Sequence, residues 1–256
     1  NYERGLKVDK GIGFSRTIKL DWLDLVAFLC VQQTDPIEIK QQLENSISAA
    51  VKGNDARRKT LDVLSAIWIK TEQTAPKLRE EALAIFPTLS SSAQRLWIHY
   101  GMVLLCYPFF RRVTAIIGQR SRLEETISRK FVKEKMAGEY GQLGALNRSV
   151  ERVMASLMDW GLLAKTEEKD IYKIVYKQYR AEKQIESWLL ACALFAYPAE
   201  TLAFNDLVRL PELFPFVVTL GIDDFLRDPH FEVQRQGGQL HMISLRSAFT
   251  MPNSFR

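Results

Sequence analysis

Residues 145–175 of the chain read ALNRSVERVMASLMDWGLLAKTEEKDIYKIV. In the first half, apolar residues recur every three or four positions, which places them on one face of a helix that ends near Trp160. Gly161 follows, and glycine most easily adopts the left-handed conformation that ends a helix. The second half has two apolar segments around the charged turn 165–170, which predicts a β-hairpin. The apolar helix face consists of Leu146, Val150, Val153, Leu157 and Trp160.

Two further helical patterns precede this stretch. Residues 108–119 (PFFRRVTAIIGQ) and 128–138 (SRKFVKEKMAG) carry apolar side chains at helical spacing. Glycines between positions 138 and 144 then supply a turn before the helix at 145–160. In this order of helices and hairpin, residues 108–176 resemble a winged helix-turn-helix domain. In that family, the second helix of the helix-turn-helix enters the major groove of DNA.

The resemblance implies a set of DNA-contacting residues. Asparagine and arginine side chains near the start of the groove-entering helix are suited to contacts with adenine and guanine. Lysines of the hairpin and cations of the preceding helix would contact phosphates, which position the protein without specifying a sequence. These residues are Asn147, Arg148, Ser149 and Arg152 on the groove-entering helix, Arg129, Lys130 and Lys133 before it, and Lys165, Lys169 and Lys173 in the hairpin.

Acidic residues in the same hairpin keep a second function open. Glu167, Glu168 and Asp170 would repel phosphate if the hairpin approached DNA. Glu151 places another acid within the groove-entering helix. The alternative is therefore a protein–protein adaptor that uses the winged-helix fold without binding DNA.

The positive charge of the chain is concentrated in this central region. The whole chain carries a net charge of +5. Residues 108–180 hold 15 basic and 9 acidic residues, whereas residues 181–256 hold 6 basic and 9 acidic residues. A local positive field attracts polyanions such as double-stranded DNA. The competing interpretation is that these lysines and arginines only keep a small domain soluble.

The flanking regions are also mainly helical. Residues 1–19 are polar and predicted to be extended, and amphipathic patterns up to residue 107 predict a bundle of about five helices. After residue 180, helices are expected at 182–197 and 201–214, and a hairpin at 231–245. The sequence thus predicts a mainly α protein with an N-terminal bundle (1–107), a winged helix-turn-helix (108–180) and a C-terminal helical and hairpin region (181–256). The last region is open to interpretation as a second, degenerate winged helix, whose negative charge favours contact with proteins.

No signature of an enzyme is recognisable. His99, His230 and His241 lack the neighbouring ligands that a metal site needs, and no nucleophile elbow surrounds Ser90–Ser92. We expect neither a metal nor a cofactor. The three cysteines are far apart and odd in number, which favours a reducing, cytoplasmic compartment. The most apolar run, 96–110, is shorter than the roughly 20 residues that cross a bilayer, so no membrane contact is expected.

Three short segments bear on the biological setting. They are GFSR at 13–16, IWIK at 67–70 and YPFF at 107–110. They resemble pieces of helical accessory proteins that are encoded in bacterial phage-defence islands of the BREX type. The resemblance implies a regulator or a subunit of a defence complex, with other subunits of that complex as partners. Together with the winged-helix resemblance, it leads us to expect a non-enzymatic DNA-binding protein of such a system.

Overall fold

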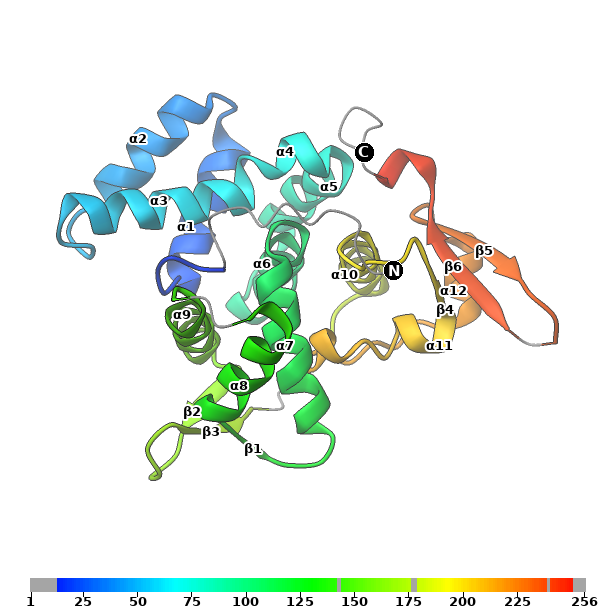
Figure 1. Cartoon of the computed structure of the whole chain (residues 1–256). Coiled ribbons are helices and arrows are strands. Elements are labelled where there is room, and N and C mark those ends of the chain that lie inside the picture. Colours follow the sequence, from blue (N-terminus) through cyan, green and yellow to red (C-terminus); the bar gives the residue numbers. More distant parts are fainter. Residues whose placement is uncertain (1–12, 142–143, 176–178, 239, 251–256) are drawn as a thin grey trace.

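The computed structural model describes residues 13–141, 144–175, 179–238 and 240–250 (Figure 1). Helices dominate, and two small antiparallel sheets accompany them, which confirms the expected mainly α class. Buried side chains of all three expected regions form one continuous cluster. The domain boundaries expected at residues 107 and 180 therefore remain predictions. The N-terminal region supplies α1 (Leu20–Gln32), α2 (Pro36–Ile47), α3 (Asn54–Trp68), α4 (Thr71–Thr74), α5 (Pro76–Ile85), a 3-10 turn η1 (Phe86–Thr88) and α6 (Ser92–Cys106).

Several N-terminal helices begin where local chemistry favours a start. Asp35 accepts a hydrogen bond from the backbone N–H of Ile37 at 2.8 Å, and Pro36 occupies the first helical position of α2. At the start of α6, Ser91 and Gln94 form a reciprocal capping box. Ser91 is therefore the residue that caps the long apolar helix.

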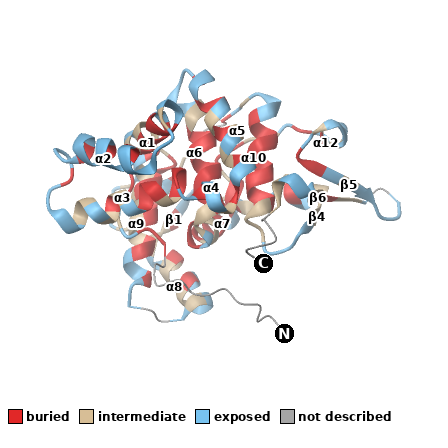
Figure 2. Cartoon of the chain, turned by 90° about the horizontal axis from the view of Figure 1, so that it is seen from above, coloured by how far each residue is buried: buried red, intermediate tan, exposed pale blue. Residues whose placement is uncertain are grey.

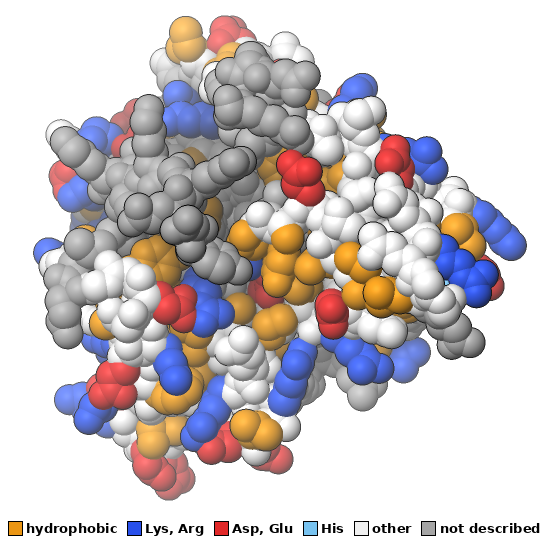
Figure 3. Space-filling view, turned by 45° about the vertical axis from the view of Figure 1, so that its right-hand side comes forward, with side chains coloured by type: hydrophobic (Ala, Val, Ile, Leu, Met, Phe, Trp, Pro, Cys, Tyr) orange, Lys and Arg blue, Asp and Glu red, His pale blue; other side chains and the backbone are white. Residues whose placement is uncertain are grey.

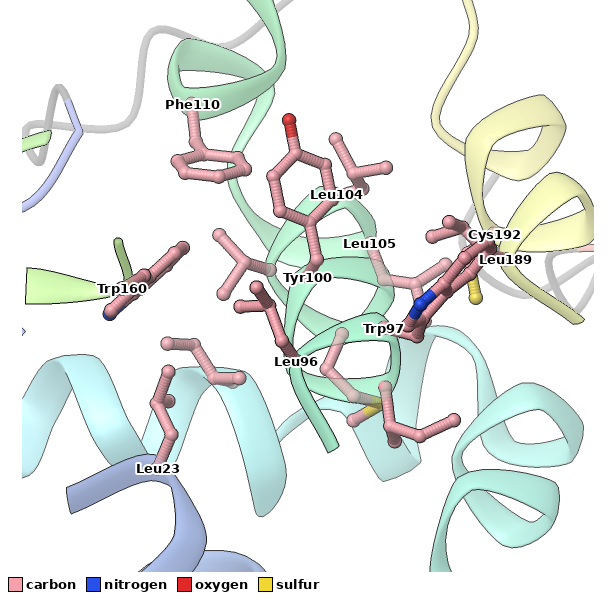
Figure 4. Packing of buried hydrophobic residues seen from close by; sticks show 14 of the residues in the cluster. Leu23, Leu96, Trp97, Tyr100, Leu104, Leu105, Phe110, Trp160, Leu189 and Cys192 are labelled. Carbon is pink, nitrogen blue, oxygen red and sulfur yellow. The ribbon is translucent and has the colours of Figure 1, made fainter. Parts of the chain in front are cut away.

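Helix α6 lies at the centre of the molecule and is buried on all sides. Every residue from 96 to 105 is buried, so the helix requires neighbours around its whole circumference. Figure 4 shows Tyr100 on the side of Trp160 and Trp97 on the side of Leu189, which belongs to the C-terminal region. Figure 2 shows the buried residues concentrated around α6, while α2 lies at the periphery.

The apolar run at 96–110 is divided between the buried part of α6 and the start of α7. Among the described residues, no single helix is long and apolar enough to cross a membrane. The pair of α6 and α7 (Pro108–Ser121) would meet that criterion by length and composition, but the two helices are bent by 119°. The bend falls at Tyr107, directly before Pro108, where proline disfavours continuation of the preceding helix.

The central region contains the expected helices and hairpin, together with a strand that the sequence patterns missed. Strand β1 pairs antiparallel with β3, and β3 pairs antiparallel with β2, giving the sheet order β1-β3-β2. Gly161 has a φ of 74°, as expected for the residue that ends the helix. After α7, the elements are β1 (Thr126–Ser128), α8 (Arg129–Tyr140), α9 (Leu146–Asp159), β2 (Leu163–Lys165) and β3 (Ile171–Ile174).

The C-terminal region also ends in a hairpin, as predicted. Gly237 and Gly238 both have positive φ angles in its turn. The expected helix at 201–214 is wrong, because residues 201–203 form a strand that pairs with the hairpin and only short helical turns follow. The elements are α10 (Lys183–Phe195), β4 (Thr201–Ala203), α11 (Phe204–Leu207), η2 (Pro211–Leu213), α12 (Ile222–Arg227), β5 (Phe231–Arg235), β6 (His241–Leu245) and η3 (Ser247–Phe249), and the sheet order is β4-β6-β5.

Close packing joins α6 to α10 and α7 to η2. A Cβ placed on Gly101 would lie 2.4 Å from the Trp188 ring, so glycine is needed for this ring to rest on α6. A Cβ on Gly118 would lie 1.8 Å from the carbonyl oxygen of Pro211. The indole of Trp188 also donates to the carbonyl of Leu78 at 2.9 Å, which ties α10 to α5.

The segment before α1 is part of the core, contrary to the expectation of a polar extension. Phe14 is 1% exposed and its ring stacks on Phe110 with centroids 5.8 Å apart. Trp160 donates its indole N–H to the carbonyl of Ile18 at 3.0 Å, and its ring lies against Phe110. Trp160 is buried, as predicted, but its described ring partners belong to the N-terminal segment and α7. Residues 1–12 of the predicted extension lie outside the described part of the chain.

A buried histidine links the C-terminal region to α5. The His230 side chain is 6% exposed and lies 2.7 Å from both Glu81 and Asp228. Ser187 donates to the other oxygen of Asp228 at 2.5 Å. Burial alone would lower the pKa of His230, but the two carboxylates outweigh burial and raise this pKa to about 9. At neutral pH the imidazolium therefore donates from both ring nitrogens.

We predict that Trp160→Ala lowers the free energy of unfolding by about 3–5 kcal/mol, because it leaves a large cavity and removes the hydrogen bond to Ile18. Urea denaturation followed by circular dichroism measures this loss. Leu123→Ala is the control, since Leu123 is 80% exposed and its truncation should change stability by less than about 0.5 kcal/mol. Equal effects of the two substitutions would contradict the central packing of Trp160.

We predict that His230 makes stability fall at alkaline pH. Because folding raises its pKa from 6.5 to about 9, its contribution is complete below about pH 6.5 and is lost as the pH rises through 9. The shift corresponds to about 3 kcal/mol. Urea denaturation at pH 6, 7.5 and 9.5 should show this loss in the wild type, and His230→Gln should remove most of it. His241→Gln, as a control, should keep the wild-type pH dependence.

Candidate nucleic-acid interface

Helix α9 presents the first half of its polar face to solvent. Its apolar face packs inward through residues such as Val150 and Val153, and this strong amphipathicity orients the helix. Asn147 and Arg148 in the first turn are exposed, and Arg152, one turn later, is half-buried. Ser149, which was expected at the interface, is only 5% exposed and lies on the packed side.

An ion pair connects α8 to the polar face of α9. Lys133 lies 2.6 Å from Glu151, and the two side chains are 25% and 42% exposed. The hydrogen bond from Lys133 lowers the pKa of the Glu151 carboxyl, and the positive charges of Arg129 and Arg152 lower it further. Glu151 is therefore ionised at neutral pH and lies among three cations. It neutralises part of the surface that the sequence predicted to contact DNA.

Arg129, the first residue of α8, links this helix to the hairpin. Its guanidinium lies 3.1 Å from Asp170, donates to the Tyr172 hydroxyl and stacks over the Tyr172 ring at 5.5 Å. The backbone N–H of Arg129 also donates to the carbonyl of Asp170 at 2.8 Å. These contacts occupy Arg129 within the fold. Lys130, by contrast, is 84% exposed, and Glu134 lies 3.8 Å from it.

The hairpin lysines are exposed but do not share one face. Lys165 pairs in register with Tyr172, whereas Lys173 pairs with Ala164 on the adjacent position. Because neighbouring residues of a strand point to opposite faces, Lys165 and Lys173 project from opposite sides of the sheet. Lys169 lies in the turn between the strands. A single phosphate backbone would therefore meet only part of this set.

The predicted interface thus divides into paired and unpaired cations. Arg129, Lys130 and Lys133 each form an ion pair with an acid of the same region. Within the described residues, no carboxylate lies at ion-pair distance from the remaining expected cations. These are Arg148, Arg152, Lys165, Lys169 and Lys173.

Charges of both signs are mixed elsewhere on the surface. On the face shown in Figure 3, lysines and arginines alternate with acidic side chains, and apolar side chains gather between them. A sign-mixed surface creates a weaker field than a segregated one.

Within the described part of the chain, no group of three or more His, Cys, Asp and Glu residues is placed to hold a metal ion. A pocket of about 350 Å³ lies beside His230 and carries both acids and bases, including the ion pair of Lys183 and Asp224. The sequence patterns missed the assembly around His230, because Glu81 is 149 positions away from it along the chain.

Three structural features bear on the function of this region. They are strand β1 beside the hairpin, the exposed first turn of α9, and the acids that pair with cations of α8. Comparison of the chain with family models, with curated proteins and with solved structures gave no match.

Proposed function

We propose that the chain is a non-enzymatic DNA-binding protein in which residues 108–175 act as a winged helix-turn-helix. The order of elements supports this proposal: a helix, a strand, two helices and a hairpin, with the hairpin's second strand in the middle of the sheet. In a helix-turn-helix, the second helix lies in the major groove of DNA. We assign this role to α9.

The exposed first turn of α9 carries the proposal. Asn147 and Arg148 point away from the core and have no partner among the described residues, so their donors and acceptors are available to base edges. Arg152 and the hairpin lysines supply phosphate contacts. Lys130 adds a further exposed cation at the start of α8. Arg129, Lys133 and Ser149 belong to the supporting structure in this proposal.

The biological setting is part of the same proposal. A regulator or a subunit of a bacterial phage-defence system would have duplex DNA and other defence subunits as partners. The resemblance of short segments supports this setting, and the genes that neighbour this one provide the direct check. An occurrence among unrelated metabolic genes would contradict it.

A protein–protein adaptor is the second candidate function. It is favoured by the ion pairs of Lys133 with Glu151 and of Arg129 with Asp170, which cancel charge on the proposed DNA-facing side. An adaptor would need no continuous positive surface. The two candidates differ in what the remaining unpaired cations do, and that difference is measurable.

We predict that single cation substitutions on α9 weaken DNA binding in two distinct ways. Arg152→Ala should reduce the slope of log affinity against log salt by about 0.9 for every duplex, as the loss of one phosphate contact does. Arg148→Ala should cost about 1–3 kcal/mol on a preferred sequence only, as the loss of a bidentate base contact does. Fluorescence anisotropy across a salt series measures both, with duplexes of random sequence and duplexes selected by the wild type.

Lys40→Ala and Lys52→Ala are the matched controls, because each removes one exposed cation from the N-terminal bundle. They should leave the affinity and the salt slope unchanged. The proposal fails if the wild type does not bind duplexes at low salt. It also fails if the α9 variants behave like these controls, and the adaptor then takes its place.

We predict that Glu151→Gln strengthens DNA binding. The substitution removes the acid that lies among Lys133, Arg129 and Arg152, and it frees Lys133 to contact phosphate, so the salt slope should rise by up to about 0.9. The lost ion pair should lower the free energy of unfolding by no more than about 1 kcal/mol. The same anisotropy measurement applies, with Glu44→Gln on exposed α2 as the control. Weaker or unchanged binding would favour the adaptor.

A further inference from the structure

Residues 13–20, which we call the bridge, connect α9 to the N-terminal bundle through hydrogen bonds. The backbone N–H of Ile18 donates to the Ser156 hydroxyl at 2.8 Å, and that of Leu20 donates to Asp159 at 2.8 Å. In the other direction, the Ser15 hydroxyl lies 3.4 Å from the carbonyl of Lys59 in α3. Figure 1 shows this segment between α3 and α9. Residues 15–20 are thus hydrogen-bonded both to the first half of α3 and to the second half of α9.

The anchoring of this bridge is firm. Phe14 and Ile18 are 1% and 0% exposed, and Phe14 packs edge-on against Tyr107 with ring centroids 5.0 Å apart. Asp159 supplies the hydrogen-bond acceptor that the start of α1 lacks, since Lys19 provides no side-chain cap. The residues between the anchors therefore have fixed positions relative to α9.

Three arginines, one on the bridge and one in each of the two helices that it joins, have no acid at ion-pair distance within the described residues. Arg16 lies on the bridge itself, and Arg152 precedes Ser156 by one turn of α9. Arg57 lies in α3 two residues before Lys59, and its guanidinium donates to the neutral side chain of Asn54. All three side chains are half-buried, which limits the conformations available to them.

The neighbouring cations of α3 differ in this respect. Arg58 and Lys59 lie 2.8 and 2.6 Å from Asp55, and Arg58 also lies 3.9 Å from Asp62, so both cations have an acid at ion-pair distance. The basic run at 57–59, which the sequence shows as a single cluster, therefore leaves only Arg57 without an acid. Unneutralised guanidinium groups in restricted positions are suited to phosphate oxygens, which they bind through paired N–H donors.

We propose that Arg16 and Arg57 extend the DNA interface from α9 across the bridge onto the N-terminal bundle, where they contact phosphates of the same duplex. The proposal rests on the proposed function of α9. It adds a second contact region and assigns it a role in affinity without sequence preference, since phosphate contacts carry no sequence information. The N-terminal bundle then takes part in DNA binding directly instead of only supporting the central region.

The double variant Arg16→Gln with Arg57→Gln tests this extension. It should reduce the salt slope by about 1.8, for two lost phosphate contacts, on random and preferred duplexes alike. The ratio between the two affinities should stay within twofold of the wild type. Arg16→Lys with Arg57→Lys keeps both charges and should retain the slope. Lys40→Gln with Lys52→Gln removes the same charge from the bundle at exposed positions and should leave binding unchanged.

The outcomes separate the two proposals. If the wild type and all variants fail to bind DNA, the proposed function fails, and this inference falls with it. If the wild type binds and Arg152→Ala weakens binding, but the Arg16 and Arg57 double variant behaves like the lysine control, only this inference is wrong.

Chemical modification of the wild type avoids any loss of folding in the variants. Phenylglyoxal reacts with accessible guanidinium groups, and peptide mass spectrometry locates the modified arginines. Duplex DNA should protect Arg16 and Arg57 at least threefold, while Arg235 in the distant C-terminal hairpin should react equally with and without DNA. Equal modification of Arg16 and Arg57 in both conditions would overturn the inference.

Discussion

The complete burial of α6 is the constraint on which the rest of the structure depends. A helix without a polar face can be covered only by neighbours on every side, and residues 96–105 leave it no such face. The N-terminal helices cover one side, α7 continues from its end, and α10 covers another side through the close contact at Gly101. The three regions of the chain therefore share one core.

The one histidine of α6 shows how its polar groups are satisfied. The indole of Trp68 can only donate, so Nδ1 of His99 accepts from it at 3.3 Å, and the ring proton resides on Nε2. That proton is donated to Asp24 at 2.8 Å, and Arg95 holds both oxygens of Asp24. Burial lowers the pKa of His99, which keeps the ring neutral. These contacts satisfy both ring nitrogens of the buried His99, so neither nitrogen is free to bind or react with a ligand.

Sequence patterns were sufficient to predict the elements whose conformation depends on interactions within a few residues. The period of α9, the glycine at its end and the paired glycines of the second hairpin each have a backbone cause within a few residues. Strand β1 has three residues, too few for alternation to show, and it forms because β3 lies beside it. Strand β4 was likewise hidden in a helical pattern at 201–214, and its pairing with β6 decided the conformation.

The same distinction explains what could be predicted of the interface. Exposure of Asn147, Arg148 and the hairpin lysines follows from helix and strand periods that are visible in the sequence. The pairing of Lys133 with Glu151, 18 residues later, and of Arg129 with Asp170 depends on how α8 packs against α9 and β3. No pattern within one element contains that information. The burial of Phe14 and Ile18 was missed for the same reason, since it depends on contacts with α9 and Trp160.

The central and C-terminal regions share an order of elements but differ in the charge at the first turn of the helix before each hairpin. Both run from a helix through a strand and further helices to a hairpin, and in both sheets the last strand lies in the middle. The first turn of α12 carries Asp223 and Asp224, whose charges interact favourably with the helix dipole. The first turn of α9 carries Arg148, whose charge opposes it.

A cation at that position costs the isolated protein about 0.3–1 kcal/mol. A phosphate bound at the same place would offset this cost, because it would interact favourably with both the arginine and the backbone N–H groups of the first turn. Two acids at the start of α12 would instead repel it. In the proposed function, the sign of charge at this one turn therefore favours α9 as the site of the polyanion and disfavours the start of α12.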